Sequence, residues 1–361
     1  MIRTYRELGS LADEWNRLAL DAGTPFMSHE WLSAWCNAFG DRRCSWIVLH
    51  DEDGSIRACT CVQRGRSGKL ASATNVHNPD WEVLARDEQA RSELWSELVH
   101  EGASRIVLQG MRGDKEGTRF VSGELERAGY RAVRIPGPFC PWLPLPSSWE
   151  ELLEGSSSSL RAQVRRRRRG LEREGAMTFR VSGGPATLEH DLEMFLQLEA
   201  SGWKGRNGTA ILSKPSTHGL YREFARGAAA QGWLRLYFLE LDGEVIAADF
   251  GCAFAGTGVF LKTGFNEAHG RLSPGLVLRA EVLRSSIEEG LGGYDFLGDP
   301  DIYKTRWTSE VRPRLGIWAY RREALPGYLY RKRLRPLLKS ARNQALELRA
   351  RVPERSSKAR G

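Results

Sequence analysis

The sequence predicts an α/β protein in two domains, with a mixed and largely antiparallel sheet flanked by helices. A chain of 361 residues is long enough to bury two separate cores. Hydrophobic residues at 41% and 12 tryptophans are typical of a folded globular chain. Segments with alternating apolar residues also recur between segments with helical spacing, which is the pattern expected of strands and helices in turn.

The net charge of +8 is concentrated at the C-terminal end of the chain. Residues 321–361 contain 13 lysines and arginines against three glutamates, so residues 1–320 are nearly neutral. The sequence has no apolar run of about 18 residues and no signal peptide, so we expect a cytoplasmic protein. Its basic tail, 326–361, either rests peripherally on an anionic membrane surface at the inner face or frays in solution.

The first half is expected to alternate strands and helices. Its elements are a helix from His29 capped by Ser28, a hairpin over 45–65, strands over 105–111 and 131–139, and a helix over 119–130. The proline-rich segment 140–148 is interpreted as a linker, which places a first domain at residues 1–145.

The second half shows a similar pattern and is predicted to form a domain over 146–325. Its elements are helices over 160–175, 187–203 and 217–233, strands over 177–184 and 256–265, and a hairpin over 233–254. This hairpin turns at Asp242-Gly243 and the earlier one at Asp53-Gly54, a common hairpin turn. The short match indicates a duplicated α/β domain.

A helix start follows the last strand of that group. Ser273 is placed as the N-cap and Pro274 at the first helical position, with Gly290 as the terminator. Free backbone N–H groups and the positive end of a helix dipole suit a phosphate or pyrophosphate, and Arg271 would add a charge-assisted contact. The alternative is a segment that only caps a helix.

Four stretches of the second half support a family resemblance: "RRRRRGLEREG", "SGWKGRNGTAIL", "LRLYFLELDGEVIAADF" and "YDFLGDPDIYKTRWT". Together, and in this order of elements, residues 155–315 resemble the GNAT acyltransferase superfamily. They resemble most its CelD-like branch, described as GNAT proteins of polysaccharide biosynthesis. That branch is also similar to one half of the Fem-type aminoacyltransferases, which carry two GNAT-like domains and use aminoacyl-tRNA. The resemblance implies tandem GNAT-like domains, with a first domain that lacks the Ser-Pro-Gly loop and is non-catalytic.

The resemblance also implies the donor and two catalytic roles. The donor would be acetyl-CoA or a longer acyl-CoA, with its pyrophosphate bound by Arg271, Ser273, Gly275 and Leu276. Tyr303 stands where the family places a proton-donating tyrosine, with a packing tyrosine as the alternative. Asp249 lies among small and apolar residues on a presumed central strand, so a raised pKa would suit a general base. A carboxylate paired with an arginine or lysine is the alternative for Asp249.

Candidates for binding the acceptor are cations close to an aromatic residue, a combination that suits sugar rings or phosphate. They are Trp203, Lys204, Arg206, Lys262, Lys304 and Trp307. The alternatives are a surface loop whose tryptophan fills the core, and a structural ion pair for Lys262 and for Asp295. His77 is the one histidine in a loop of site-like composition, and no metal site is predicted.

The five arginines of 165–169 follow a helical pattern with one thin apolar stripe, Leu160, Val164 and Leu171. They either contact phosphate or form a solvated face, because like charges four residues apart repel. The six cysteines show no CxxC pair and are interpreted as mostly buried, reduced thiols.

These observations predict an acyl-CoA-dependent N-acyltransferase whose acceptor is an amino group on a small or lipid-linked sugar or another cell-envelope or exopolysaccharide precursor. One alternative is a Fem-type aminoacyl or peptidyl transfer from tRNA, the only case in which a nucleic acid would be a partner. The other is a non-catalytic module of a polysaccharide assembly, associated with the membrane.

Overall fold

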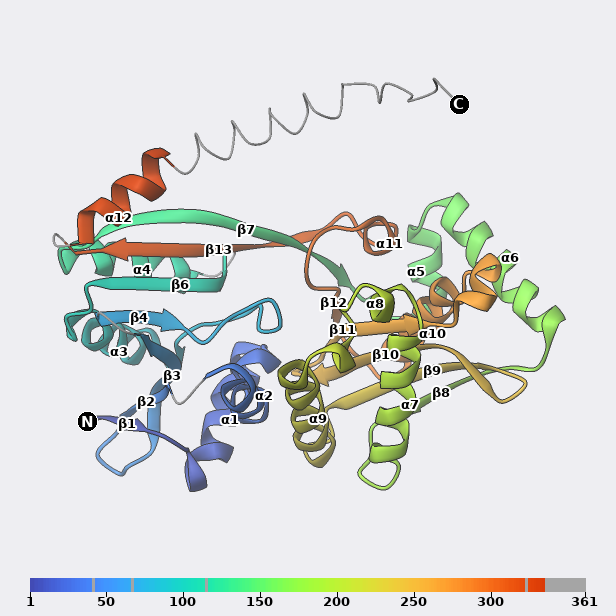
Figure 1. Ribbon diagram of the computed structural model, residues 1–361, viewed down its shortest axis with the longest axis horizontal. Helices are drawn as coiled ribbons and strands as arrows, with labels where there is room; N and C mark the ends of the chain where they lie inside the picture. Colours follow the sequence, from blue (N-terminus) through green and yellow to red (C-terminus); the bar gives the residue numbers. More distant parts are fainter. Residues whose placement is uncertain (41–42, 66–67, 114–115, 322–323, 335–361) are drawn as a thin grey trace, which may run out of the picture.

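The computed structural model describes residues 1–334 except 41–42, 66–67, 114–115 and 322–323. Most of the predicted basic tail, residues 335–361, therefore lies outside the described residues. The described chain forms two halves, each with its own helices around one continuous sheet (Figure 1). None of the helices in this part of the chain has the length and apolar composition needed to cross a membrane.

The elements follow the predicted alternation. The first half contains β1 (Ile2–Tyr5), α1 (Ala12–Ala22), α2 (His29–Trp35), β2 (Cys44–His50), β3 (Ile56–Gly65), β4 (Lys69–Ser72), β5 (Leu84–Ala85), α3 (Glu88–His100), β6 (Arg105–Arg112), α4 (Glu116–Arg127) and β7 (Arg131–Pro144). The second contains α5 (Trp149–Gly155), α6 (Ser158–Glu174), β8 (Met177–Ser182), α7 (Leu188–Ser201), α8 (Trp203–Arg206), α9 (Pro215–Ala230), β9 (Leu234–Leu241), β10 (Glu244–Phe254), β11 (Thr257–Phe265), α10 (Pro274–Glu288), β12 (Gly293–Asp295), α11 (Ile302–Thr305), β13 (Val311–Tyr320) and α12 (Leu325–Leu329).

The two halves repeat one arrangement, which confirms the predicted tandem fold. The sheet order is β1-β2-β3-β4-β6-β13-β7-β12-β11-β10-β9-β8. In each half an antiparallel run of strands ends in a parallel crossover through a helix, β4-α3-β6 in the first and β11-α10-β12 in the second. The hairpins β2-β3 and β9-β10 occupy equivalent places in the two runs. At the second, Asp242 and Gly243 both have positive φ, the conformation that a two-residue hairpin turn requires.

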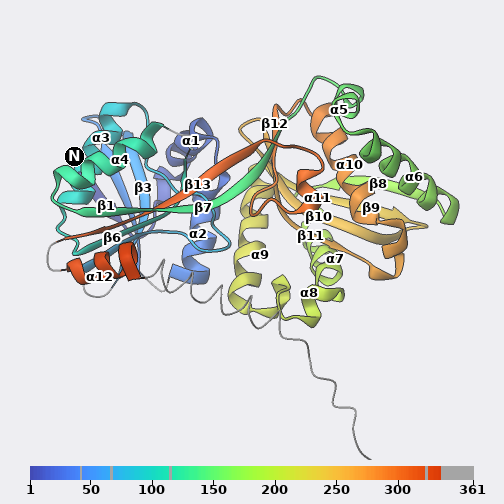
Figure 2. The same cartoon turned by 90° about the horizontal axis from the view of Figure 1, so that it is seen from above.

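Only the last part of the proline-rich segment, residues 145–148, is the connection that the sequence predicts. Residues up to Pro144 belong to β7, a long strand that pairs with β13 in the first half and with β12 in the second (Figure 2). Prolines lack an N–H, and the ladder accommodates them with a register shift between Pro313 and Leu315. β13 comes from the predicted second domain but pairs with β6 and β7, so the sheet of the first half contains a strand from the end of the chain.

Packing and charge pairs join the two halves. Trp31 of α2 packs edge-on against Phe224 of α9, with ring centroids 4.6 Å apart. Where the two halves meet, buried Arg314 of β13 forms ion pairs with Asp80 of the first half and Asp295 of β12. Asp295 therefore has the structural pairing that the sequence analysis gave as its alternative. Because a buried charge needs its partner, these contacts fix one half against the other.

Candidate active site

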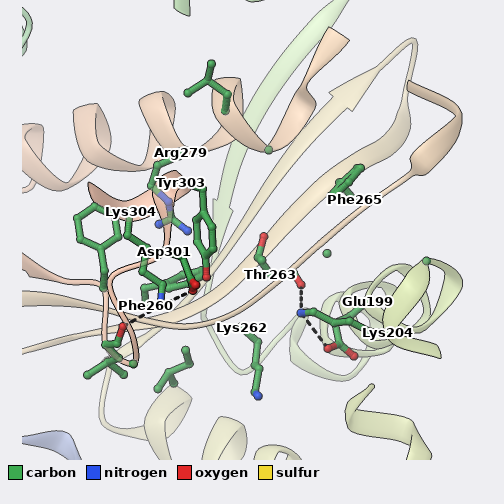
Figure 3. A pocket seen from close by; sticks show the side chains of 18 of the residues that line it. Glu199, Lys204, Phe260, Lys262, Thr263, Phe265, Arg279, Asp301, Tyr303 and Lys304 are labelled. Carbon is green, nitrogen blue, oxygen red and sulfur yellow. Dashed lines mark hydrogen bonds and ion pairs between the residues drawn. The ribbon is translucent and has the colours of Figure 1, made fainter. Parts of the chain in front are cut away.

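A cavity of about 890 Å³ opens where β11 separates from β12. The two strands pair only from Thr257 to Val259, and β11 then continues to Phe265 along the cavity wall. The first turn of α10, the α7-α8 junction and α11 form the other walls (Figure 3). The loop around His77 in the first half forms the remaining wall of the cavity. The volume lies in the range of small-molecule sites.

The start of α10 faces this cavity, with a conformation that differs from the predicted N-cap. Ser273 has φ +53°, in the left-handed region, and its side chain makes no capping hydrogen bond. Leu297 on the opposite wall has φ +52° and also lines the cavity. Such backbone strain, costing about 1–3 kcal/mol per residue, concentrates at functional sites.

Three of the four predicted donor-binding residues line the cavity: Ser273, Gly275 and Leu276. A Cβ placed on Gly275 would meet open space, so a ligand can approach the first turn closely. Arg271 does not belong to this group. Its guanidinium is exposed and forms an ion pair with Glu174 at 2.7 Å, because the end of α6 packs beside the loop.

Asp249, the predicted base, is buried at 2% exposure and does not line the cavity. Its Oδ2 lies 2.7 Å from Nη2 of Arg279, a buried residue of α10. Burial raises the pKa of Asp249, and the Arg279 charge opposes that rise. The Arg279 guanidinium also lies 4.1 Å from the centroid of the Phe260 ring and donates to the Tyr294 hydroxyl. The structure therefore favours the paired-carboxylate alternative for Asp249.

Tyr303 of α11 lines the cavity as the resemblance implied, and its side chain lies near Arg279 and Asp301 (Figure 3). Tyr303 is 45% exposed, and the partial burial of its side chain together with the neighbouring Asp301 carboxylate raises the pKa of Tyr303 to about 12. The phenol therefore keeps its proton at neutral pH and can donate a hydrogen bond to a ligand in the cavity.

Lys304 and Trp307 also line the cavity, but both are buried at 5% exposure. Lys304 Nζ donates to the carbonyl oxygens of Leu297 and Asp299 at 2.9 Å each. Lys304 thus holds the strained loop in place. Because its ammonium is already hydrogen-bonded within the protein, its role is structural rather than substrate binding.

The predicted acceptor-binding residues Trp203, Lys204 and Arg206 lie on the short helix α8, which is held by charge pairs. Lys204 Nζ donates to the Thr263 carbonyl at 2.6 Å and lies 3.2 Å from the Glu199 carboxylate. Arg206 pairs with Glu267 at 2.8 Å and does not line the cavity. Trp203, half exposed at 49%, lines it and remains available to a ligand.

Lys262 of β11 enters the cavity on the side opposite Arg279 and Tyr303 (Figure 3). Its ammonium lies 5.6 Å from the centroid of the Tyr221 ring. Burial and the charge of Lys204 lower the pKa of Lys262, while Glu199 raises it. Among the ion pairs of the described residues, none includes Lys262.

The predicted site residues did not include Arg279, Tyr221 or Glu199. For Arg279 a signal existed: it lies three residues after Leu276 and four before Leu283, so a cation interrupts the apolar stripe of its helix. Tyr221 and Glu199 carry no comparable local signal, because their helices reach the cavity through tertiary packing.

The arginine helix α6 buries Leu160, Val164 and Leu171 as predicted. Arg167 donates to the carbonyl oxygen of Arg271, and Arg168 pairs with Glu172 and Glu281. Four other arginines are exposed, and their side chains make no hydrogen bond or ion pair with any other described residue: Arg165, Arg166, Arg169 and Arg173. Part of the run thus anchors the loop before α10, and these four are free to meet an anion.

The cysteines are unpaired thiols, five of them buried and Cys36 half-buried. Within the described ranges, one group of metal-ligand type is present: the Sγ atoms of Cys36, Cys44 and Cys61 lie within 4.8 Å of one another. Three thiolates suit a soft cation such as Zn²⁺. None of the three lines the cavity, so the candidate active site does not depend on them.

Comparisons with known proteins agree with this geometry. Residues 158–305 match a family model described as an acetyltransferase (GNAT) domain, and this segment contains α6 to α11. The second half therefore carries a GNAT-type N-acyltransferase domain, and the chain is an enzyme. No curated protein sequence matches the chain.

Solved structures share the fold across both halves. FemX has a TM-score of 0.58 at 13% identity, covering 89% of this chain and 97% of its own. The C-terminal domain of a putative lysylphosphatidylglycerol synthetase from Agrobacterium fabrum has a TM-score of 0.54 at 14% identity, covering 86% and 91%. L-PGS from Bacillus licheniformis has the same TM-score and identity, covering 89% and 95%. At such identities the likeness shows the fold alone, and the CelD-like branch stays a prediction.

Proposed function

We propose that the chain transfers an acyl group from acyl-CoA to an amino group of a sugar or cell-envelope precursor. One observation carries the proposal: the first turn of α10 opens onto the cavity at Gly275, beside the place where β11 and β12 separate. The positive end of a 15-residue helix with no side chain in the way suits the pyrophosphate of coenzyme A.

In this reaction the acceptor nitrogen attacks the thioester carbonyl carbon. An N–C bond forms and the C–S bond breaks, and the acceptor loses a proton while the leaving sulfur gains one. No covalent enzyme intermediate is needed, so the residues have to orient the reactants and stabilise the departing thiolate. We assign Tyr303, which lines the cavity, the donation of a hydrogen bond to that sulfur. Trp203 provides an exposed ring for the acceptor.

Calorimetric titration with acetyl-CoA and longer acyl-CoA tests the donor. We expect Gly275→Glu to abolish binding, since it adds bulk and negative charge at the proposed phosphate site. Gly292→Glu is the matched control, because Gly292 also has open space around its Cβ position but lies beyond the other end of α10. If both variants bind acyl-CoA equally well, the pyrophosphate does not bind at the first turn of α10.

A second candidate, transfer of an aminoacyl group from tRNA, is favoured by the four solvent-facing arginines of α6. The fold shared with FemX and with the lysylphosphatidylglycerol synthetase domain is compatible with it. Phosphate contacts would give RNA affinity that falls steeply with salt. We therefore expect bulk tRNA to bind at low salt, and to bind weakly to a variant with Gln at these four positions, only if this candidate is correct.

A membrane-associated binding module without catalysis is the third candidate of the sequence analysis. Firm binding to anionic vesicles with no turnover of any thioester would support it.

A further inference from the structure

Three lysines line the cavity, and Lys262 is the one whose ammonium contacts no carboxylate or carbonyl oxygen of the described residues. Lys204 is bound by Glu199 and the Thr263 carbonyl, and Lys304 by Asp301 and two carbonyls. Lys262 has only the face of the Tyr221 ring. Lys262 is half-buried in the cavity wall, and an anion in the cavity would stabilise its partly desolvated ammonium.

The surroundings of Lys262 come from both halves of the chain and are rigid. The His77 ring stacks on Phe39 with centroids 5.6 Å apart, and its Nδ1 lies 3.5 Å from the Tyr221 hydroxyl. Tyr221 in turn packs edge-on against Trp31 and Phe250. His77 and the Tyr221 ring therefore form a fixed wall opposite β11, with two polar groups beside the Lys262 ammonium.

The charges around this wall are mostly positive. Lys262, Lys204 and Lys214 act on it, while Glu199 is already paired with Lys204. The other cavity-lining carboxylates, Glu267 and Asp301, are paired with Arg206 and Lys304. Burial, followed by Lys262 and Lys214, lowers the pKa of His77 to about 4, so His77 is neutral at pH 7. The subsite is thus built for a negative group.

We propose that Lys262 binds an anionic group of the acceptor, a carboxylate or a phosphate monoester, at the first-half wall of the cavity. The inference rests on the proposed function, in which the donor phosphates occupy the first turn of α10. Lys262 points away from Arg279 and Tyr303 (Figure 3), so it is not directed at the end where the leaving sulfur would be. The acceptor would therefore be an amine that carries its own negative charge, and Lys262 a specificity-determining residue.

Steady-state kinetics with three related amines test the proposal: glucosamine, glucosamine 6-phosphate and muramic acid, each with saturating acetyl-CoA. We expect a charged amine to be preferred over glucosamine. Lys262→Met should raise KM for that amine about 10- to 100-fold, the range of a charge-assisted hydrogen bond. It should leave kcat and the neutral amine unchanged, and Lys262→Arg should restore part of the preference. Lys332→Met, which removes an exposed charge away from the cavity lining and from His77, is the control.

Other outcomes decide against the proposal. No preference for a charged amine, or the same loss for all three, would overturn it, and loss of kcat for all would instead make Lys262 a base. If no amine is acylated, thermal stabilisation by inorganic phosphate and by acetate tests the subsite directly. A shift in the wild type that Lys262→Met removes and Gly275→Glu retains supports the subsite even if the acyl-CoA titration fails. Equal shifts in the wild type and Lys262→Met refute it.

Discussion

Replacing Asp249 by Asn should destabilise the protein strongly, because it would leave the Arg279 guanidinium buried without its counterion. Asp249 is 2% exposed and Arg279 5% exposed, and 2.7 Å separates their ion-pairing atoms. Removing one partner of a buried ion pair costs about 3–5 kcal/mol. Because Asn and Asp have nearly the same size, the lost free energy of unfolding comes from the missing charge and not from a cavity.

Asp249→Asn and Arg279→Met should lose different amounts of stability, because the charged group that remains differs between them. A guanidinium cannot lose its proton in a protein, whereas a carboxyl can gain one. Burial already raises the pKa of Asp249, so in Arg279→Met the orphaned carboxyl would become protonated and escape part of the penalty. We expect Asp249→Asn to cost more than Arg279→Met. The double variant Asp249→Leu/Arg279→Met should cost less than the sum of two single losses.

Urea unfolding followed by tryptophan fluorescence measures the free energy of unfolding of each variant, and acyl transfer measures its activity. If Asp249→Asn unfolds within about 0.5 kcal/mol of the wild type, a size typical of surface substitutions, while kcat falls sharply, the reasoning is refuted. Asp249 would then be the general base after all.

Three further predictions concern the cavity. Tyr303→Phe should lower kcat for acyl transfer about 10²- to 10⁴-fold with little change in acyl-CoA affinity by calorimetry; unchanged kcat would assign Tyr303 to packing. His77 has a pKa near 4 in the folded state against an ordinary 6.5, so the unfolded chain binds more protons between these values and stability should fall as pH drops from 6.5 to 4. His77→Gln should flatten that slope in urea titrations, and an unaltered slope would contradict the assignment. Gly205→Ala should lower Tm, because its Cβ would overlap the Ala200 carbonyl oxygen and push α8 from α7, whereas Gly219→Ala in open space on α9 should not.

The elements that follow from local sequence were predicted well. The turn at Asp242-Gly243 and the helix after Pro274 depend on residues next to each other, so their chemistry is visible in the sequence. Gly275 and Lys262 stand on such elements and Tyr303 was singled out through the family resemblance; all three line the cavity.

The wrong predictions concern residues whose structure depends on a partner far away in the sequence. The proline-rich stretch up to Pro144 is a strand because β13, about 170 residues later, supplies its partner. Arg206 is paired with Glu267, which a local interpretation of a glycine-rich loop does not include. Asp249 could not be assigned to Arg279 without knowing that α10 packs on β10, and contacts of this kind are set by the tertiary fold.

Because β13 lies between β6 and β7, the first half of the chain cannot complete its sheet without a strand from the second half. During synthesis, β6 and β7 emerge more than 160 residues before the strand that will lie between them. Until then both present open edges, which attract other strands. A fragment ending before Val311 should therefore aggregate although it contains every element of the cavity. The sheet of the nascent first half cannot close until β13 has left the ribosome.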